Sequence, residues 1–210
     1  MHELIKQYIS KNNQDFQRYN SWNHCFNAFG NPHLDNDTLA LHLGFYLASW
    51  GMYRGSSGVL QFDYKIHLKA ISILKQYNNL RCNKDVEVDK SDIKEINELK
   101  EKLSKHYRSF KYLNSKNKIR SINPTDTLLS KIILGTLGCL PAFDRLFIKG
   151  VKKTINTKRF TTLKEKSLYN LFDFISTNHG ELSNIKKQRP NYTIMKIVDM
   201  YFWQIGNSNS

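Results

Sequence analysis

Cysteine is scarce in this chain. Its 210 residues include three, Cys25, Cys82 and Cys139, and no two of them form a Cys-x-x-Cys pair. An odd, widely spaced set argues against a disulfide framework and against a zinc ribbon. The histidines form no His-x-x-x-His or Glu-x-x-His pair on a helix face, and the chain has no phosphate loop of the Walker type and no serine elbow. We therefore expect free thiols, no metal and no cofactor.

Long apolar runs are missing as well. No stretch of the sequence approaches the ~20 residues that a bilayer-spanning helix needs. The first residues, MHELIK, lack the cationic start and the apolar stretch of a secretory signal. We expect a cytoplasmic, monomeric protein with no membrane partner.

The alternation typical of β-strands is absent too, and apolar residues recur instead at helical spacing. The pattern predicts an all-α protein with a polar loop over 81–90 and another loop over 111–123. The expected helices are residues 2–29 (one or two helices), 38–52, 59–77, 91–110, 125–137, a short helix from 142, 162–177 and 192–205.

Acidic residues are few: 18 Asp and Glu face 32 Lys and Arg, which gives a net charge of +14. The excess is concentrated, because residues 100–120 hold eight basic residues and one acidic residue, and residues 145–166 hold eight and one. Residues 85–98, in contrast, hold six acids. Clustered cations favour binding to a polyanion such as nucleic acid. A solvated basic surface without a ligand stays open as an alternative.

The segment between the two basic stretches, TLLSKIILGTLGCLPAFDRLF (127–147), resembles part of the helix–hairpin–helix DNA glycosylases. In that superfamily an apolar helix ends in an aromatic-Gly pair, and a short turn follows whose Asp opens the next helix as the catalytic carboxylate. Leu137-Gly138 matches the pair and Asp144 matches the Asp. A carboxylate there would stabilise the oxocarbenium character of the sugar or orient a water. Stabilisation of its own helix is the alternative role for Asp144.

The resemblance implies a two-lobed helical bundle within one compact unit, residues 1–210. One lobe would span about 36–140, and the other would combine 1–35 with 141–210. The family's hairpin usually carries Gly-apolar-Gly, whereas this chain has INPTD over 122–126, where Asn123 and Thr125 would cap a helix near a phosphate. Thr127 stands where lyase-active members carry a Lys. The resemblance therefore implies a monofunctional enzyme that hydrolyses the N-glycosidic bond without a Schiff base.

A flipped base needs a pocket, and the turn over 48–57 has suitable residues. Trp50 and Tyr53 would stack on the base and Arg54 would contact a phosphate or a base edge, while core packing is the alternative for both aromatic residues. The remaining predicted contacts to nucleic acid are Ser56, Ser57, Lys131, Arg145, Lys149, Lys152 and Lys153. Asp199, a carboxylate on an apolar helix, is a second candidate acid.

These expectations describe a DNA glycosylase that excises a modified or damaged base from double-stranded DNA, in repair or in antiviral defence. Two alternatives stay open: a non-catalytic nucleic-acid-binding protein, and an RNA-processing or defence-associated nuclease. The glycosylase hypothesis makes a geometric prediction. The basic residues of 100–120 and 145–166 should lie on the same face of the molecule as Asp144.

Overall fold

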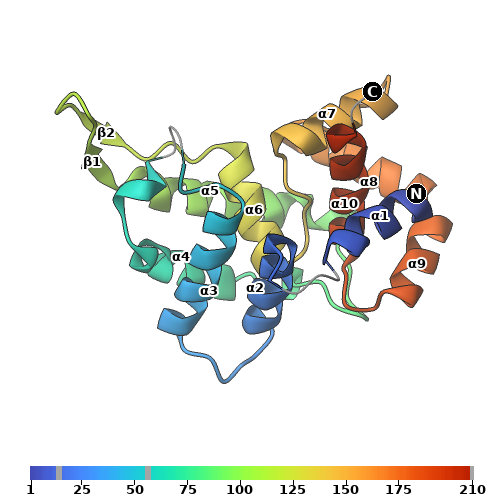
Figure 1. Ribbon diagram of the computed structural model, residues 1–210, viewed down its shortest axis with the longest axis horizontal. Helices are drawn as coiled ribbons and strands as arrows, with labels where there is room; N and C mark the ends of the chain where they lie inside the picture. The colour runs from blue at the N-terminus through green and yellow to red at the C-terminus, as the bar shows by residue number, and fades with distance from the viewer. Residues whose placement is uncertain (13–15, 55–57, 209–210) are drawn as a thin grey trace.

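A computed structural model describes residues 1–12, 16–54 and 58–208 (Figure 1). The described chain is mainly helical, which confirms the all-α class. The α-helices are α1 (His2–Asn12), α2 (Ser21–Phe29), α3 (Asn36–Ser49), α4 (Leu68–Lys75), α5 (Ile93–Arg108), α6 (Asp126–Thr136), α7 (Arg145–Thr154), α8 (Glu165–Thr177), α9 (His179–Gln188) and α10 (Ile194–Asn207). Short 3-10 turns are η1 (Arg18–Asn20), η3 (Val59–Gln61), η4 (Tyr64–His67), η5 (Asn78–Leu80) and η6 (Lys90–Asp92).

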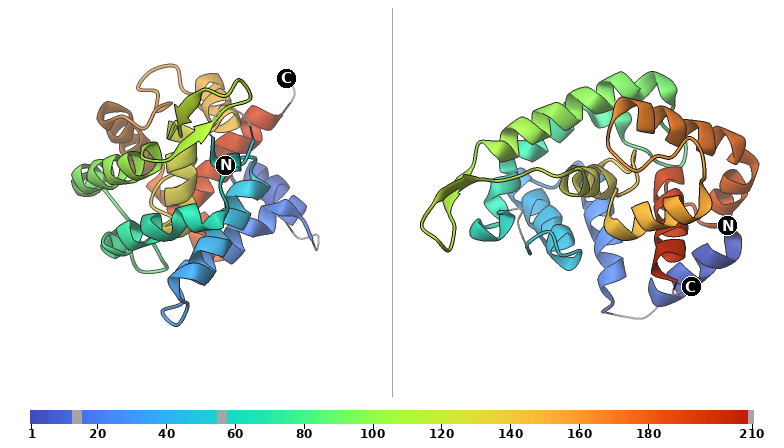
Figure 2. Two further views of the ribbon diagram at one scale, coloured as in Figure 1. Left: turned by 90° about the vertical axis from the view of Figure 1, so that its left-hand side faces the viewer. Right: turned by 90° about the horizontal axis from the view of Figure 1, so that it is seen from above.

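The expected loop over 111–123 is wrong for residues 111–121, which form an antiparallel hairpin. Strand β1 (Lys111–Leu113) pairs with β2 (Ile119–Ser121), and Leu113 lies opposite Ile119. Strands of three residues are too short to show an alternating pattern in the sequence. The hairpin projects from the rest of the molecule (Figure 2).

Two helical predictions also differ from the structure. The helix expected over 59–77 is divided into η3, η4 and α4, because Phe62 is extended and the Asp63 side chain caps a new turn by accepting a hydrogen bond from the Lys65 amide at 2.8 Å. Helix α9 was not expected, because its polar sequence offers only Leu182 and Ile185 as buried residues. Apolar periodicity finds helices through their buried stripe, and a narrow stripe escapes it.

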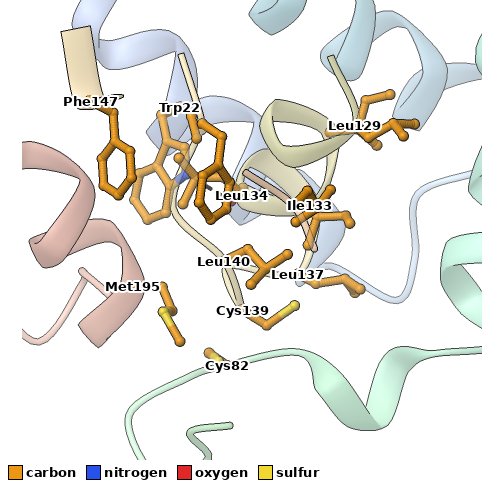
Figure 3. Packing of buried hydrophobic residues seen from close by; sticks show 14 of the residues in the cluster. Trp22, Cys82, Leu129, Ile133, Leu134, Leu137, Cys139, Leu140, Phe147 and Met195 are labelled. Atoms are coloured by element: carbon orange, nitrogen blue, oxygen red, sulfur yellow. Dashed lines mark hydrogen bonds between the residues drawn. The ribbon is translucent and has the colours of Figure 1, made fainter. Parts of the chain in front are cut away.

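Helix α6 lies at the centre of a core that extends through the molecule (Figure 3). Leu134 and Ile133 of α6 pack there with Trp22 of α2, whose indole N–H donates to the Leu134 carbonyl at 2.9 Å. Cys82 and Cys139 are buried free thiols in the same core, and burial raises the pKa of each. One continuous cluster of buried side chains therefore connects α6 with the other described helices.

Two groups of helices share this core. Helices α2 to α6 pack with one another, while α7, α9 and α1 pack against α10 (Figure 1). The first 35 residues are divided between the groups, since α1 contacts α10 and α2 contacts α3 and α6. Helices α7 and α10 cross closely because each has a glycine at the crossing point, Gly150 in α7 and Gly206 in α10. A Cβ on Gly150 would overlap the Phe202 carbonyl, and a Cβ on Gly206 would overlap the Leu146 carbonyl. This crossing sets the position of α7.

None of the described helices combines the length and the apolar character that a bilayer-spanning segment requires.

Candidate nucleic-acid interface and the Asp144 site

The turn between α6 and α7 positions Asp144. Helix α6 ends because Gly138 adopts a left-handed conformation (φ +67°), and the amides of Leu137 and Gly138 both donate to the Ile133 carbonyl. The carbonyl of Gly138 accepts a hydrogen bond of 2.8 Å from the Thr193 hydroxyl. The start of the turn is therefore attached to the start of α10.

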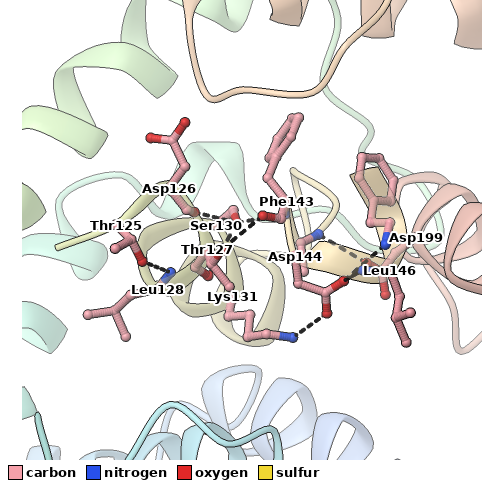
Figure 4. Close-up of polar contacts among 12 residues, drawn as sticks. Thr125, Asp126, Thr127, Leu128, Ser130, Lys131, Phe143, Asp144, Leu146 and Asp199 are labelled. Atoms are coloured by element: carbon pink, nitrogen blue, oxygen red, sulfur yellow. Dashed lines mark hydrogen bonds and ion pairs between the residues drawn. The ribbon is translucent and has the colours of Figure 1, made fainter. Parts of the chain in front are cut away.

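The end of the turn is held on two sides (Figure 4). From α6, the Thr127 hydroxyl donates to the Phe143 carbonyl and the Ser130 hydroxyl accepts from the Phe143 amide, both at 2.9 Å. From α10, a carboxylate oxygen of Asp199 accepts from the Ala142 amide at 3.0 Å. Thr127, predicted to contact nucleic acid, thus uses its hydroxyl inside the protein.

Asp144 is the N-cap of α7. Its Oδ1 accepts hydrogen bonds from the amides of Leu146 and Phe147, each at 3.0 Å, and its Oδ2 accepts from Lys131 Nζ at 2.9 Å. The side chain is 16% exposed. The carboxylate thus lies beside the positive end of the α7 dipole and beside the lysine ammonium. The sequence-based expectation that Asp144 opens a helix is confirmed in its geometry.

Lys131 was predicted to contact nucleic acid, but its side chain is buried inside the protein. Its side chain is 4% exposed, paired with Asp144, and its ammonium lies 4.9 Å from the ring centroid of Trp50. Asp144, Lys131 and Trp50, which are far apart in the sequence, therefore form one cluster. The sequence does carry a signal for it, because Lys131 is the only charged residue between Asp126 and Asp144, and a lysine on an apolar helix needs a partner.

Trp50 sits in an aromatic and cationic environment. Tyr19 and Trp203 meet its ring edge-on, with centroids 5.6 and 6.2 Å away, and the Arg18 guanidinium lies 5.2 Å from its ring centroid. Its indole Nε1 is buried and has no hydrogen-bond partner in the part of the chain that the structure describes. An unpaired donor of this kind is costly to bury. Trp50 is half-buried at the junction of the two helix groups.

Tyr53 does not join this cluster. Its hydroxyl pairs with His67 Nε2 at 2.9 Å, and His67 Nδ1 pairs with the Tyr107 hydroxyl at 2.7 Å. Burial raises the pKa of Tyr53 to about 12 and lowers the pKa of His67 to about 3. The chain of three side chains lies within the group α2 to α6.

Three other predicted contacts follow in the sequence. Arg54 is exposed at the edge of the described residues, and Ser56 and Ser57 lie outside them.

The start of α6 is occupied by the protein's own groups. Thr125 caps the helix by accepting from the Leu128 amide at 3.3 Å, and Asp126 accepts from the Leu163 amide at 2.8 Å. Asn123 is exposed just before this cap. The side chain of Asp126 places negative charge beside the first turn, which is unfavourable for a phosphate there.

The outer face of α7 forms a cationic hollow with the first turn of α6. Arg145, Lys149 and Lys152 recur at helical spacing and are exposed. The hollow has a volume of about 710 Å³, and its lining residues are Thr127, Arg145, Ile148, Lys149, Lys152 and Lys153. No acidic residue is among them, and Asp144 directly precedes Arg145. Five of the predicted nucleic-acid contacts therefore meet on one surface.

The basic stretch 100–120 divides between two places. Lys100 on α5 pairs with Glu101 at 3.1 Å, and Lys102 lies 4.8 Å from the Tyr77 ring centroid, so this part belongs to the outer side of α5. Lys105 and Arg108 lie on the last two turns of the same helix, and the other four basic residues belong to the β1–β2 hairpin. In Figure 1 the hairpin and α7 both lie along the upper edge of the molecule, with the start of α6 between them. Figure 2 shows both from above.

Across the described ranges, no three His, Cys, Asp or Glu side chains gather in a way that could hold a metal ion. A scan against models of protein families found no match to the chain, and neither a search of curated proteins nor a search of solved structures found one.

Proposed function

We propose that the protein binds duplex DNA through the outer face of α7. The observation that carries this proposal is the hollow beside α7, lined by four cations and no carboxylate. Basic side chains one and two turns apart on a helix match the spacing needed to contact successive phosphates, and each contact releases condensed counterions. The exposed ends of Arg145, Lys149 and Lys152 supply these contacts, while the buried crossing of α7 with α10 keeps the helix in place.

The salt dependence of binding tests the proposal. Wild-type protein should bind a mixed-sequence duplex of about 20 base pairs with an affinity that falls steeply as salt rises. The variant Arg145→Gln/Lys149→Gln/Lys152→Gln should lower the slope of log K against log [salt] by about three, because each phosphate contact contributes about one. Three exposed lysines elsewhere, in Lys65→Gln/Lys69→Gln/Lys84→Gln, are the matched control. Equal slopes for the two variants would contradict the proposal.

We further propose a catalytic role for the same face, excision of a base from a flipped nucleotide at Asp144. The observation that favours it is the cluster of Asp144, Lys131 and Trp50, whose aspartate directly precedes Arg145 of the hollow. A carboxylate at the start of the helix that follows an apolar helix is also what the resemblance to the helix–hairpin–helix DNA glycosylases implies.

The reaction would be hydrolysis of an N-glycosidic bond. Water adds to C1′ of the sugar, the bond from C1′ to the base nitrogen breaks, and the proton lost by the water goes to the departing base. Asp144 would orient the water and stabilise the positive charge that develops on the sugar. The ammonium of Lys131 weakens that stabilisation at 2.9 Å, so substrate must separate the two groups for the carboxylate to act at full strength.

The same ion pair supports the non-catalytic alternative. Both oxygens of Asp144 already accept hydrogen bonds, two from α7 amides and one from Lys131, and this fully accounts for the residue as a helix cap tied to α6. In that case the protein binds duplex without altering it.

Duplexes that carry alkylated or otherwise modified bases distinguish the two. Incubation followed by hot alkali should give strand breaks with wild-type protein and none with Asp144→Asn, whose duplex affinity should persist. Borohydride during the reaction should trap no covalent complex, because hydrolysis forms no Schiff base; a trapped complex that is lost in Lys131→Met would replace hydrolysis with lyase chemistry. Binding without strand breaks on any substrate would leave the non-catalytic function.

A further inference from the structure

The β1–β2 hairpin carries an exposed apolar pair among cations. Leu113 is 60% exposed and Ile119 is 71% exposed, and the two lie directly opposite each other in the register. Directly paired side chains of two strands point to the same face and lie close together. Exposed aliphatic side chains at the end of a projecting element have no role in the core.

The hairpin contains four basic residues and no acidic residue between residues 111 and 121: Lys111, Lys116, Lys118 and Arg120. All four are exposed. The apolar pair is thus surrounded by positive charge, which selects a polyanionic partner that also offers apolar surface. The grooves of a duplex meet both conditions, because phosphates border them and base edges form their floor.

The hairpin is held in a defined shape. Asn114 fixes the turn: its side-chain oxygen accepts from the amides of Lys116 and Lys118 at 3.0 and 2.9 Å, and its own amide donates to the Lys118 carbonyl. Asn117 occupies the left-handed region (φ 52°), which asparagine tolerates well. Little conformational entropy is left to lose when such a turn binds.

The base of the hairpin is anchored as well. Tyr112 is half-buried and covers Gly58 so closely that a Cβ there would overlap its ring. Phe62 meets the rings of Phe110 and Tyr112 edge-on, with centroids 5.4 and 6.5 Å away. The face with Tyr112 therefore docks on the protein, and the opposite face, with Leu113 and Ile119, is presented to solvent.

We infer that this hairpin enters the major groove of the duplex bound by α7, with Leu113 and Ile119 against base edges and Lys111, Lys116 and Lys118 on the bordering phosphates. A major groove about 12 Å wide admits a two-stranded ribbon. The inference rests on the proposed function, since it assigns a second contact to the same duplex. It also gives the protein a site that senses base identity, because thymine methyl groups are the apolar features of that groove.

Two hairpin variants separate the apolar contribution from the charged one. Leu113→Thr/Ile119→Thr keeps strand propensity and should lower duplex affinity roughly tenfold, with an unchanged salt slope, because it removes apolar burial and no charge. Lys116→Gln/Lys118→Gln should lower the salt slope by about two. Leu41→Thr/Phe45→Thr, an exposed apolar pair on α3, is the matched control and should leave affinity unchanged.

The groove is identified by interference. Methylation of guanine N7, which lies in the major groove, should block binding of wild-type protein at positions where it does not block Leu113→Thr/Ile119→Thr. If wild-type protein binds duplex with the slope expected for α7 and the hairpin variants bind equally well, the hairpin inference fails and the proposed function stands. If the protein binds no duplex, and binds vesicles of anionic lipid through the hairpin instead, both fail.

Discussion

Two lysine–aspartate pairs lie on either side of the turn that leads into α7, and their geometry is nearly the same. Lys131 meets Asp144 at 2.9 Å and Lys196 meets Asp199 at 3.0 Å. Each lysine also lies over an aromatic ring, Trp50 in the first pair and Tyr8 in the second, at 4.9 and 5.2 Å from the centroid. Each aspartate also accepts from backbone amides of the turn or of the helix after it.

The surroundings of the two pairs differ. The Asp199 side chain is 8% exposed, within α10, whereas the Asp144 side chain is 16% exposed and directly precedes the first cation of the α7 hollow. Two pairs of the same chemical composition can thus have different roles, and the solvent exposure of the aspartate distinguishes them. We assign the Asp199 pair to the stability of the turn and the Asp144 pair to the candidate site.

The largest effect is expected from Asp199→Ala. It leaves the Lys196 ammonium buried without its partner and the Ala142 amide without its acceptor, which should cost about 3–5 kcal/mol in the free energy of unfolding. Urea denaturation measures this cost. The double variant Lys196→Met/Asp199→Leu should recover most of it, and a loss below 1 kcal/mol in the single variant would mean that this pair is not the structural one.

Asp144→Ala should cost less, about 2–4 kcal/mol, measured in the same way. It removes the cap of α7 and leaves Lys131 unpaired, but solvent reaches this pair more easily. Asp144→Asn retains an acceptor for the two α7 amides and should lie between the wild-type protein and Asp144→Ala. If Asp144→Ala destabilises the protein more than Asp199→Ala, the assignment of the two pairs is reversed.

Acid should destabilise the protein through His67, which belongs to neither pair. The stabilities of the Asp144 and Asp199 variants must therefore be compared at one pH. In the unfolded chain His67 binds a proton near its ordinary pKa of 6.5, and in the folded protein only near 3. The unfolded state therefore binds more protons between these values, and stability falls as the pH decreases from 6.5 towards 3. The loss between pH 7 and pH 5 should be about 2 kcal/mol. His67→Gln should reduce this loss, and an unchanged loss would place the acid sensitivity elsewhere.

The smallest effect concerns binding. Removal of the negative charge beside the hollow in Asp144→Asn should raise duplex affinity about threefold at low salt, whereas Asp199→Asn should leave it unchanged. Fluorescence anisotropy at two salt concentrations measures both. Equal changes in the two variants would show that Asp144 does not border the bound duplex.

Sequence patterns predicted the features that depend on neighbouring residues, namely helices with an apolar periodicity and helix ends with a capping residue. The apolar helix α6, the cap at Thr125 and the helix start at Asp144 follow from periodicity and capping residues, which act over a few positions. The hairpin was missed because its strands of three residues contain too little alternation.

The pairing of Lys131 with Asp144 was missed for another reason. It depends on how far the turn folds back on α6, and only tertiary packing sets that distance. The placement of Tyr53 with His67 and Tyr107, away from Trp50, depends on the helix crossings in the same way.

Protection of lysines from acetylation by a bound duplex tests the central claim most directly. Mass spectrometry after brief acetylation, with and without duplex, measures the rate at each lysine. We expect duplex to protect Lys149, Lys152, Lys116 and Lys118 and to leave Lys69, Lys84 and Lys187 unchanged. Protection of the second set, with Lys149 and Lys152 as reactive as in the free protein, would contradict the assignment of α7 as the nucleic-acid interface.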